Sequence, residues 1–387
     1  MPPAHQPLKK ETLLGEGLME LMQQSGQVCL TILCPLHPSN PDRYTDRLSL
    51  KHLAQQAGVQ IQKHWEPAVA ERLLHQLEII LDQIDLVHPP QGLGIYLNER
   101  FQRVESYPFA VPPEVYVDKR FPIRECLWYL QLSRPVYLLS LSEHQLRLEE
   151  IRNGNWTEIK DHFFPSKIHD EYEYSKPARS SSYAGHSHVK IFERDKLEMQ
   201  HTRLRSAFRD SNTPLRPYLM NDEPLILAGP ERDISLFRQV SDHGSRVIAQ
   251  LSGNYQVGHQ ELFRDKVSHA IREHRQIQMQ QWVSTFFEKW GSGLARCGLN
   301  DCWQAVEAGQ GLMLLVERGY REPMYQSIAS GQFSKESTAA GSRYTPDAID
   351  ELMEKTIEKG GTVMLVDNYL LFTAQRVALI LRYSTQA

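Results

Sequence analysis

The sequence predicts a multidomain α/β protein. The chain has 387 residues, which is more than one ordinary hydrophobic core accommodates, so two or three domains are expected. Short β-prone runs alternate along it with segments whose apolar residues recur at helical spacing. With 41% apolar and 23% charged residues, the composition is that of a folded protein.

The sequence pattern of the first third of the chain predicts that it forms a mixed α/β domain. Residues 28–33 form a short β-prone run that ends at Cys34-Pro35, and a polar loop follows at 35–44. The segment 67–86 carries its leucines and isoleucines on one helical face. In chain order we expect helices at 11–24, 48–57, 67–86 and 122–132, a strand at 28–33, and a hairpin of strands at 92–97 and 101–107.

A domain boundary is expected at Arg134-Pro135, because a residue before proline is disfavoured in helices. Beyond it we expect a hairpin, a long polar and serine-rich loop, a basic helix, a buried strand and a long helix that passes into the next domain. The hairpin lies at 136–141 with 146–151 and the loop at 161–183. The basic helix lies at 189–208, the buried strand at 224–228 and the long helix at 262–290.

The last third predicts an α/β sandwich. Helices are expected at 299–308 and 346–358, the second ending at Gly360-Gly361. Strands are expected at 311–316, 362–366 and 377–381, with a loop rich in glycine and serine at 327–342. The predicted domains are therefore 1–134, 135–275 with a long basic loop at 160–190, and 276–387.

The charge is unevenly distributed. The net charge of −4 argues against a whole surface coated by nucleic acid. Between Ser175 and Arg209, however, the chain has eight Lys or Arg and only three acids. His186, His188 and His201 lie in the same segment. A local RNA contact is one interpretation of this segment, and a solvated loop with a charged helix face is the other.

Several functional classes are disfavoured. Five cysteines spread over the chain suit neither a disulfide framework nor a metal site, so we expect reduced thiols and no metal. No glycine-rich loop followed by Lys-Ser/Thr occurs, so nucleotide hydrolysis is not expected, and we expect no cofactor. No apolar run reaches the length of a membrane span, and a cytoplasmic protein is expected.

Several stretches carry a family resemblance. The segment 295–317 contains a glycine, a helix with alanine and glutamate, a glycine turn and an apolar strand. Further matching stretches are 223–230, 29–35 with 47–53, 94–104, 116–121, 359–363 and 378–383. Together they resemble the bacterial archaeo-eukaryotic release factors, a branch of the release factor and Pelota superfamily. The resemblance implies an RNase H-like middle domain, an L7Ae-like last domain and docking in the ribosomal A site.

One departure from the family pattern decides the expected chemistry. Release factors carry Gly-Gly-Gln at the tip of a middle-domain loop, where glycines allow backbone conformations barred to other residues. The matching place here is Tyr183-Ala-Gly-His-Ser-His188, in which only Gly185 keeps that freedom and no glutamine follows. We therefore expect no normal peptide release and classify the chain as a binding protein rather than an enzyme.

The candidate site residues fall into two groups. We expect RNA contact, with imidazole and tyrosine rings meeting nucleotides and cations meeting phosphates, from Lys176, Arg179, Tyr183, Gly185, His186, Ser187, His188, Lys190, Arg194, Arg203 and Arg205. By its position in the family, the polar loop of the first domain is a candidate for contact with the decoding region through His37, Asn40, Arg43 and Tyr44. Turn formation by Pro38 and Pro41 explains that loop equally well.

The leading hypothesis is a factor that occupies the A site of idle or stalled ribosomes, for hibernation or rescue. Its partners would be the ribosome through rRNA, with tRNA as a further contact, and by family analogy a GTPase resembling elongation factor Tu. No DNA or membrane partner is expected. The alternatives are a peptidyl-tRNA hydrolase or nuclease that uses the His186 loop, and a stress adaptor that binds protein or another RNA.

Overall fold

The computed structural model describes residues 16–24, 28–38, 43–84, 86, 88–168, 185–253, 260–337 and 341–383. It is a mixed α/β protein, as predicted. The chain folds into two compact units: Met1–Leu132 together with Gln278–Ala387, and Ser133–Ile277. The first unit combines the segments predicted as the first and last domains, each with a sheet of its own. The boundary between the units falls inside helix α8 (Gln260–Gly291).

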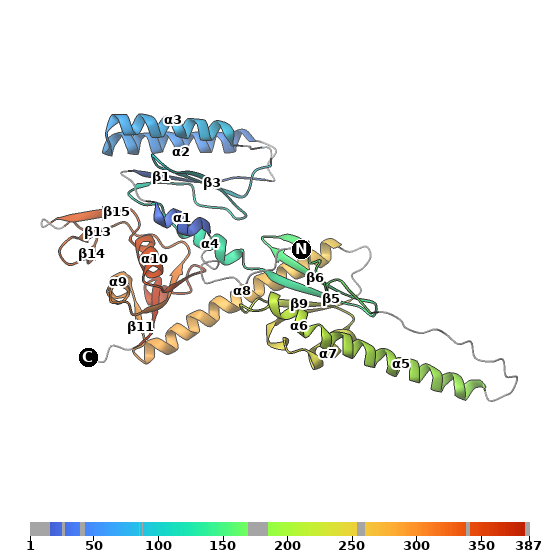
Figure 1. Cartoon of the computed structure of the whole chain (residues 1–387). Coiled ribbons are helices and arrows are strands. Elements are labelled where there is room, and N and C mark those ends of the chain that lie inside the picture. The colour runs from blue at the N-terminus through green and yellow to red at the C-terminus, as the bar shows by residue number, and fades with distance from the viewer. Residues whose placement is uncertain are drawn as a thin grey trace. The chain divides into compact units, whose positions relative to one another are not determined.

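The N-terminal sheet of unit 1 is antiparallel and lies between two helical layers. Its strands follow the order β3 (Gln102–Tyr107), β2 (Gly92–Leu97), β1 (Cys29–Pro35) and β4 (Glu114–Asp118). Alternate β1 residues point to opposite faces. Leu30 and Ile32 join one core with helices α2 (Arg43–His64) and α3 (Pro67–Gln83), which Figure 1 shows side by side over the sheet. Cys29 and Leu33 join the other core, with α1 (Glu16–Gln23) and α4 (Arg124–Leu132).

The C-terminal part of unit 1 is built on a second sheet. The strand order is β11 (Ala295–Cys297), β17 (Val377–Leu381), β12 (Gly311–Glu317) and β16 (Thr362–Val366), with β12 and β16 parallel. Helices α9 (Leu299–Glu307) and α10 (Ala348–Glu358) pack on it. Leu314, Leu315 and Val316 of β12 are fully buried. The predicted helices and strands of this region are confirmed within a few residues.

A small third sheet corrects the loop predicted at 327–342. Strands β13 (Met324–Ser327), β14 (Phe333–Ser334) and β15 (Ser342–Thr345) pair within and beside that range. The Phe333 ring is buried against Trp303, with ring centroids 4.9 Å apart. Phe333 also exchanges backbone hydrogen bonds with the Asn300 side chain at 2.9 and 3.1 Å. These contacts with α9 fix a segment whose glycines and serines predicted only a loop.

Unit 2 holds one sheet with antiparallel and parallel halves. The order is β10 (Val247–Ser252), β9 (Leu225–Gly229), β5 (Val136–Leu141), β6 (Gln145–Arg152) and β7 (Asn155–Glu158), and β8 (Ser166–Lys167) also pairs with β6. Strands β5, β9 and β10 are parallel, while β5, β6 and β7 form an antiparallel meander. One core contains α5 (Gly185–Asp210) and α7 (Glu231–Val240), and another contains the start of α8. A short helix, α6 (Asn212–Leu215), follows α5.

The loop predicted at 160–190 is shorter at both ends in the described residues. At its start, Phe164 is buried at 1% exposure and β8 pairs with β6. At its end, helix α5 already begins at Gly185. The loop is shorter than predicted because the Phe164 ring packs in the core at one end and the basic helix begins earlier than predicted at the other. Residues 169–184 lie outside the described ranges.

A search of the described helices for a membrane span finds none that combines the necessary length with the necessary apolar character.

Candidate nucleic-acid interface

Helix α5 is anchored at its C-terminal end. Leu204 and Phe208 lie one turn apart on the same helical face and are buried, with exposed fractions of 2% and 0%. The Phe208 ring meets the Phe237 ring of α7 edge to face, with centroids 5.9 Å apart. The buried Ser211 hydroxyl donates to the Phe208 carbonyl at 2.7 Å. The last turns of α5 therefore belong to the core of unit 2.

The rest of α5 continues beyond that core. Its 26 residues correspond to a length of about 39 Å at 1.5 Å per residue. Every side chain from 198 to 203 is exposed or half-buried, and Figure 1 shows the helix extending away from the sheet of its own unit. We call residues 185–210 the basic arm, after its six Lys and Arg: Lys190, Arg194, Lys196, Arg203, Arg205 and Arg209.

Two cations of the basic arm face water at its anchored end. Arg205 and Arg209 are exposed and lie one helical turn apart on one face, and Arg203 is half-buried. An exposed guanidinium group can donate one or two hydrogen bonds to a phosphate. Contacts of this kind dominate nucleic-acid affinity. Arg205 is exposed in this way, and the role of Arg203 and Arg205 in RNA contact stays a prediction.

A hydrogen-bonded turn lies between β7 and β8, ahead of the undescribed segment. The Asp161 carboxylate accepts from the backbone N–H groups of Phe163 at 2.8 Å and Phe164 at 2.6 Å. Its second oxygen accepts from the Tyr218 hydroxyl at 2.8 Å. The Tyr218 ring packs edge to face on Tyr137 and Phe164. Sequence reasoning missed this turn, because its partners lie 57 residues apart.

The remaining residues predicted to contact RNA lie between 176 and 194, where the side chains are not described. Lys176, Arg179 and Tyr183 fall outside the described residues. Gly185, His186, Ser187, His188, Lys190 and Arg194 belong to α5, with only their backbone described. The helix therefore begins inside the sequence Ala184-Gly-His-Ser-His188. A helix N-terminus carries partial positive charge, which favours anions near it.

The predicted decoding-region residues are partly in a helix rather than in a loop. Arg43 and Tyr44 were expected in the polar loop, yet α2 begins at Arg43. Buried Asp46, in its first turn, accepts from the His37 backbone N–H at 3.0 Å and lies 2.8 Å from His37 Nδ1. An acid in the first turn favours the helix start. Tyr44 is 72% exposed, the Arg43 side chain and Asn40 lie outside the description, and His37 is exposed beside its carboxylate partner.

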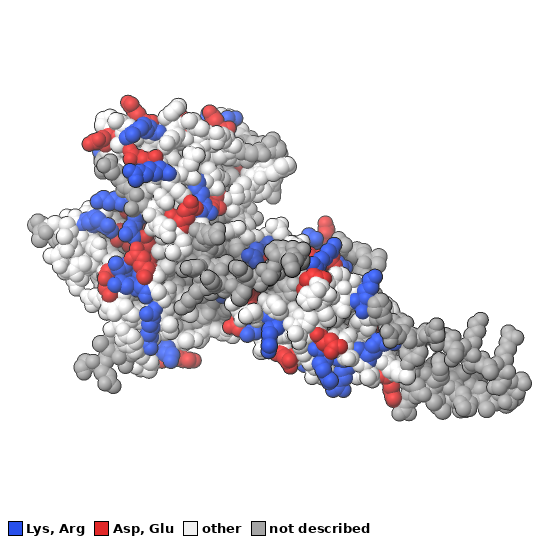
Figure 2. Space-filling model, in the orientation of Figure 1, with Lys and Arg blue, Asp and Glu red and all other residues white. Residues whose placement is uncertain are grey.

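The face drawn in Figure 2 does not form one continuous basic field. Figure 2 shows Lys and Arg interspersed with Asp and Glu on the face drawn. This agrees with the net charge of −4. Any contact with nucleic acid would therefore be local.

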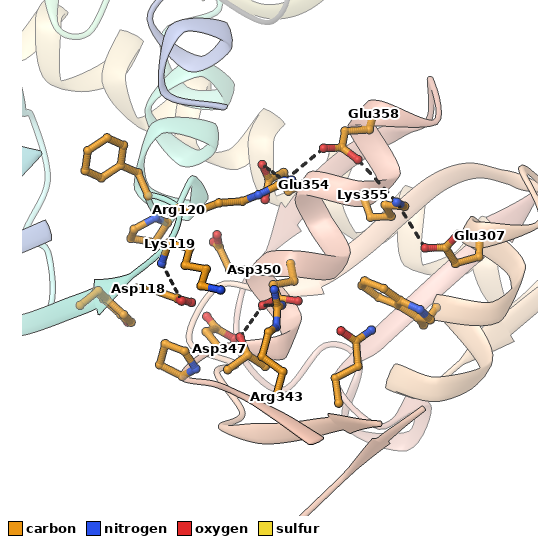
Figure 3. A pocket seen from close by; sticks show the side chains of 18 residues that line it. Asp118, Lys119, Arg120, Glu307, Arg343, Asp347, Asp350, Glu354, Lys355 and Glu358 are labelled. Carbon is orange, nitrogen blue, oxygen red and sulfur yellow. Dashed lines mark hydrogen bonds and ion pairs between the residues drawn. The ribbon is translucent and has the colours of Figure 1, made fainter. Parts of the chain in front are cut away.

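Unit 1 contains a charged cleft of about 640 Å³ that the sequence did not reveal. Its walls come from the segment after β4, from α9 and β15, and from α10. Figure 3 shows Arg120 reaching the carboxylates of Glu354 and Glu358, at 2.6 and 3.2 Å. Seven acids and four cations line it: Asp118, Glu307, Asp347, Asp350, Glu351, Glu354 and Glu358, with Lys119, Arg120, Arg343 and Lys355.

The chemistry of this cleft is that of a structural junction. Three of its cations, Arg120, Arg343 and Lys355, are paired with carboxylates. A carboxylate of the cleft, Asp350, accepts from the backbone N–H groups of Ile123 and Arg124 at the start of α4. Among the described residues no group of three His, Cys, Asp or Glu suits a metal ion. The cleft therefore joins α4 to α10 and offers phosphate little unpaired positive charge.

The thiols are not arranged for chemistry. All five cysteines are free. Burial, with a smaller effect of Asp46, raises the pKa of the Cys34 thiol to about 12, and burial raises that of Cys126 to about 11. Thiols with raised pKa values are poor nucleophiles and poor metal ligands at neutral pH.

The fold and the basic arm together define a multidomain α/β protein with an extended cationic helix on its middle segment. Comparison with protein-family models finds a match for this segment. Residues 135–310 match the model of "Bacterial archaeo-eukaryotic release factor family 3". The resemblance expected from the sequence is thereby confirmed for these residues, which include the whole basic arm.

Solved structures of an archaeal termination factor, Pelota and Dom34 align with the chain at low similarity. An archaeal translation termination factor is 17% identical, with 96% of this chain and 97% of that chain covered and a TM-score of 0.24. Archaeal Pelota, from a model of ribosome-bound Pelota and ABCE1, is 12% identical, with 98% and 96% covered and a TM-score of 0.41. Dom34 from S. cerevisiae, described as interacting with Hbs1, is 13% identical, with 79% and 78% covered and a TM-score of 0.37. Comparison with the curated proteins finds no match.

Proposed function

We propose that the chain is a ribosome-binding translation factor of the release factor and Pelota superfamily, which occupies the A site of idle or stalled ribosomes without releasing peptide. It would act in the cytoplasm in hibernation or rescue. The observation that carries the proposal is the family match over residues 135–310, because the matched segment contains the basic arm.

The position of the basic arm supports an electrostatic contact with rRNA. Its end is fixed in the core by Phe208, and its exposed Arg205 and Arg209 lie on one face. A fixed base and exposed cations allow the helix to reach into a cavity of another particle with little loss of conformational entropy. Ribosomal RNA supplies the phosphates that such cations neutralise.

The sequence at the start of the basic arm supports binding without hydrolysis. At 184–186 the chain has Ala-Gly-His, where release factors by resemblance have Gly-Gly-Gln. Ala184 and His186 replace the residues on either side of Gly185, so the set that would position a water molecule is incomplete. A GTPase that delivers the factor remains part of the proposal by family analogy.

Binding to ribosomes is tested by sedimentation with purified 70S particles at increasing salt. If about four phosphates of single-stranded character are neutralised, affinity falls about fiftyfold between about 50 and about 200 mM KCl. Arg203→Gln/Arg205→Gln should weaken binding and lower the salt slope by roughly one to two. Arg238→Gln/Arg272→Gln removes the same charge from exposed positions of unit 2 and should change neither. Binding that is absent or insensitive to salt would overturn the proposal.

The absence of hydrolysis is tested with ribosomes that carry labelled peptidyl-tRNA and a vacant A site. The native chain should release no more peptide than buffer does. Ala184→Gly/His186→Gln creates Gly-Gly-Gln and is expected to gain release. Release by the native chain that disappears in His186→Ala would instead establish the hydrolase alternative.

A further inference from the structure

The connection between β16 and β17, residues 367–376, presents two aromatic rings to water. Tyr369 is 84% exposed and Phe372 is 71% exposed. Neither takes part in the ring–ring or cation–ring contacts found among the described residues. Two large rings left in water within one short loop are unfavourable unless a partner covers them.

The backbone of this loop adopts conformations that side chains rarely permit. Tyr369, Gln375 and Arg376 have φ angles of 73°, 57° and 66°. Left-handed conformations at residues other than glycine are strained and persist only where the surrounding structure imposes them. The sequence thus keeps a tyrosine at a position where glycine would fit without strain.

A buried carboxylate imposes the shape of the loop. Glu317 is 1% exposed; one of its oxygens accepts from the Leu371 backbone N–H at 2.9 Å, and the other accepts from Arg376 Nε at 2.8 Å. The Asn368 side-chain oxygen accepts from the Gly319 backbone N–H at 2.8 Å. Leu371 and Ala374, within the loop itself, are fully buried and anchor it. The two exposed rings are therefore presented by a rigid support, which lowers the entropic cost of binding.

The charges of the loop favour a protein over a nucleic acid. Between 367 and 375 the one residue charged at neutral pH is the exposed Asp367, and no Lys or Arg occurs there. Arg376 at its end is occupied by Glu317 and by the Tyr320 ring, whose centroid is 4.5 Å from the guanidinium carbon. Phosphates would find no free cation in this loop, whereas rigid aromatic anchors with few charges are typical of protein interfaces.

We propose that residues 367–376 form a docking loop whose Tyr369 and Phe372 rings insert into an apolar pocket of a protein, with a basic residue at the pocket rim opposite Asp367. Resting on the proposed function, the partner is a protein component of the ribosome. The docking loop then adds an apolar contact in unit 1 to the salt-sensitive contact of the basic arm in unit 2.

Photocrosslinking identifies what covers the docking loop. The full chain with Phe372 replaced by p-benzoylphenylalanine is bound to purified 70S ribosomes and irradiated. The proposal predicts a crosslinked product that protease removes and ribonuclease does not. A product that ribonuclease removes would assign the loop to rRNA and overturn the proposal, as would a bound chain that gives no crosslink.

Affinity measurements separate this contact from the rest of the binding surface. Tyr369→Gly and Phe372→Ser should each weaken binding to 70S ribosomes about tenfold, with an unchanged salt slope. Tyr369→Gly should not lower the melting temperature, since glycine accepts the backbone conformation. Tyr383→Ser, at another exposed tyrosine of unit 1, is the control and should bind normally. If the native chain binds and both variants bind equally well, the docking loop alone is refuted; if the native chain does not bind, the proposed function fails with it.

Discussion

The guanidinium group of Arg124 lies 2.8 Å from the carboxylate of Asp347, and both side chains are buried. The pair joins the start of α4 to the N-cap of α10, where Asp347 also accepts from the Ile349 backbone N–H at 3.1 Å. Nε and Nη1 of Arg124 have no hydrogen-bond partner among the described atoms. The free energy of removing both groups from water therefore offsets a large part of their electrostatic attraction. Each charge is tolerated in the interior only while the other is present.

Removing one member of this pair should lower the free energy of unfolding much more than removing both. Arg124→Met leaves the Asp347 carboxylate buried without its cation and should lower the free energy of unfolding by about 3–5 kcal/mol. Arg124→Met/Asp347→Asn removes both charges and keeps an effective N-cap, so it should recover a substantial part of that loss. Urea unfolding of the two variants and the native chain measures the difference. Equal stability of both variants would contradict strong coupling.

The stability of unit 1 should depend on pH through Asp350. Burial, reinforced by the negative charge of Asp347, raises the pKa of this carboxyl group to about 7, although Arg124 and the Ile123 N–H oppose the shift. A carboxyl whose pKa is higher in the folded state stabilises fully below its ordinary value of 3.8, and this contribution is lost as the pH rises through about 7.

The corresponding experiment compares the native chain with Asp350→Asn between pH 5 and pH 8. Native stability relative to the variant should fall as the pH rises, with a slope of at most about 1.4 kcal/mol per pH unit for one proton. The comparison cancels the contributions of the other carboxyl groups, which both proteins share. A stability difference that is constant with pH, or that grows toward pH 8, would contradict a pKa of about 7 for Asp350.

The anchoring of the basic arm predicts a separate effect on stability. Phe208→Ala removes a fully buried ring from the contact with Phe237 and should cost about 3–5 kcal/mol. Phe208→Leu keeps most of the volume and should cost about 1 kcal/mol. Hydrogen exchange should increase first in α5 and α7 in the alanine variant. Exchange that rises equally in unit 1 would argue against a local anchor.

Elements with strong periodicity could be predicted from the sequence. The hairpins at β2–β3 and β5–β6, the long α8 and the buried β12 all have a continuous apolar run or a clear spacing. Strand β4 was not predicted, because all of its residues are half-buried and give no alternation. Helix α7 was also missed, although its buried Ile234 and Phe237 recur at helical spacing.

The candidate site was predictable only where charge gathers in the sequence. The basic arm was found because eight cations fall between Ser175 and Arg209. The Asp347–Arg124 pair, 223 residues apart, and the docking loop have no local signal. Tyr369 and Phe372 resemble ordinary core aromatics in sequence, and only their exposure in the fold distinguishes them. Long-range pairing and exposure are properties of the tertiary structure.

Tyr218 should stabilise the turn between β7 and β8, which precedes the basic arm in the chain. Its hydroxyl donates to Asp161 at 2.8 Å. Partial burial tends to raise the pKa of Asp161, but hydrogen bonds from the Phe164 N–H, Tyr218 and the Phe163 N–H outweigh it, so that the pKa is lowered overall. The turn is therefore most stable above the ordinary pKa of an aspartate and loses stability as the pH falls below it.

Tyr218→Phe keeps the ring contacts and removes only this donor. Because Asp161 is near the surface, the loss in stability should be about 1 kcal/mol, and it should shrink as acid protonates the carboxylate. If the turn positions the basic arm, affinity for 70S ribosomes should fall severalfold while the salt slope stays constant, since every cation remains. Tyr137→Phe, which removes a hydroxyl donating to Glu150 at 3.3 Å in the same unit, is the matched control. A change of the salt slope in Tyr218→Phe would instead show that the hydroxyl itself takes part in an ionic contact with RNA.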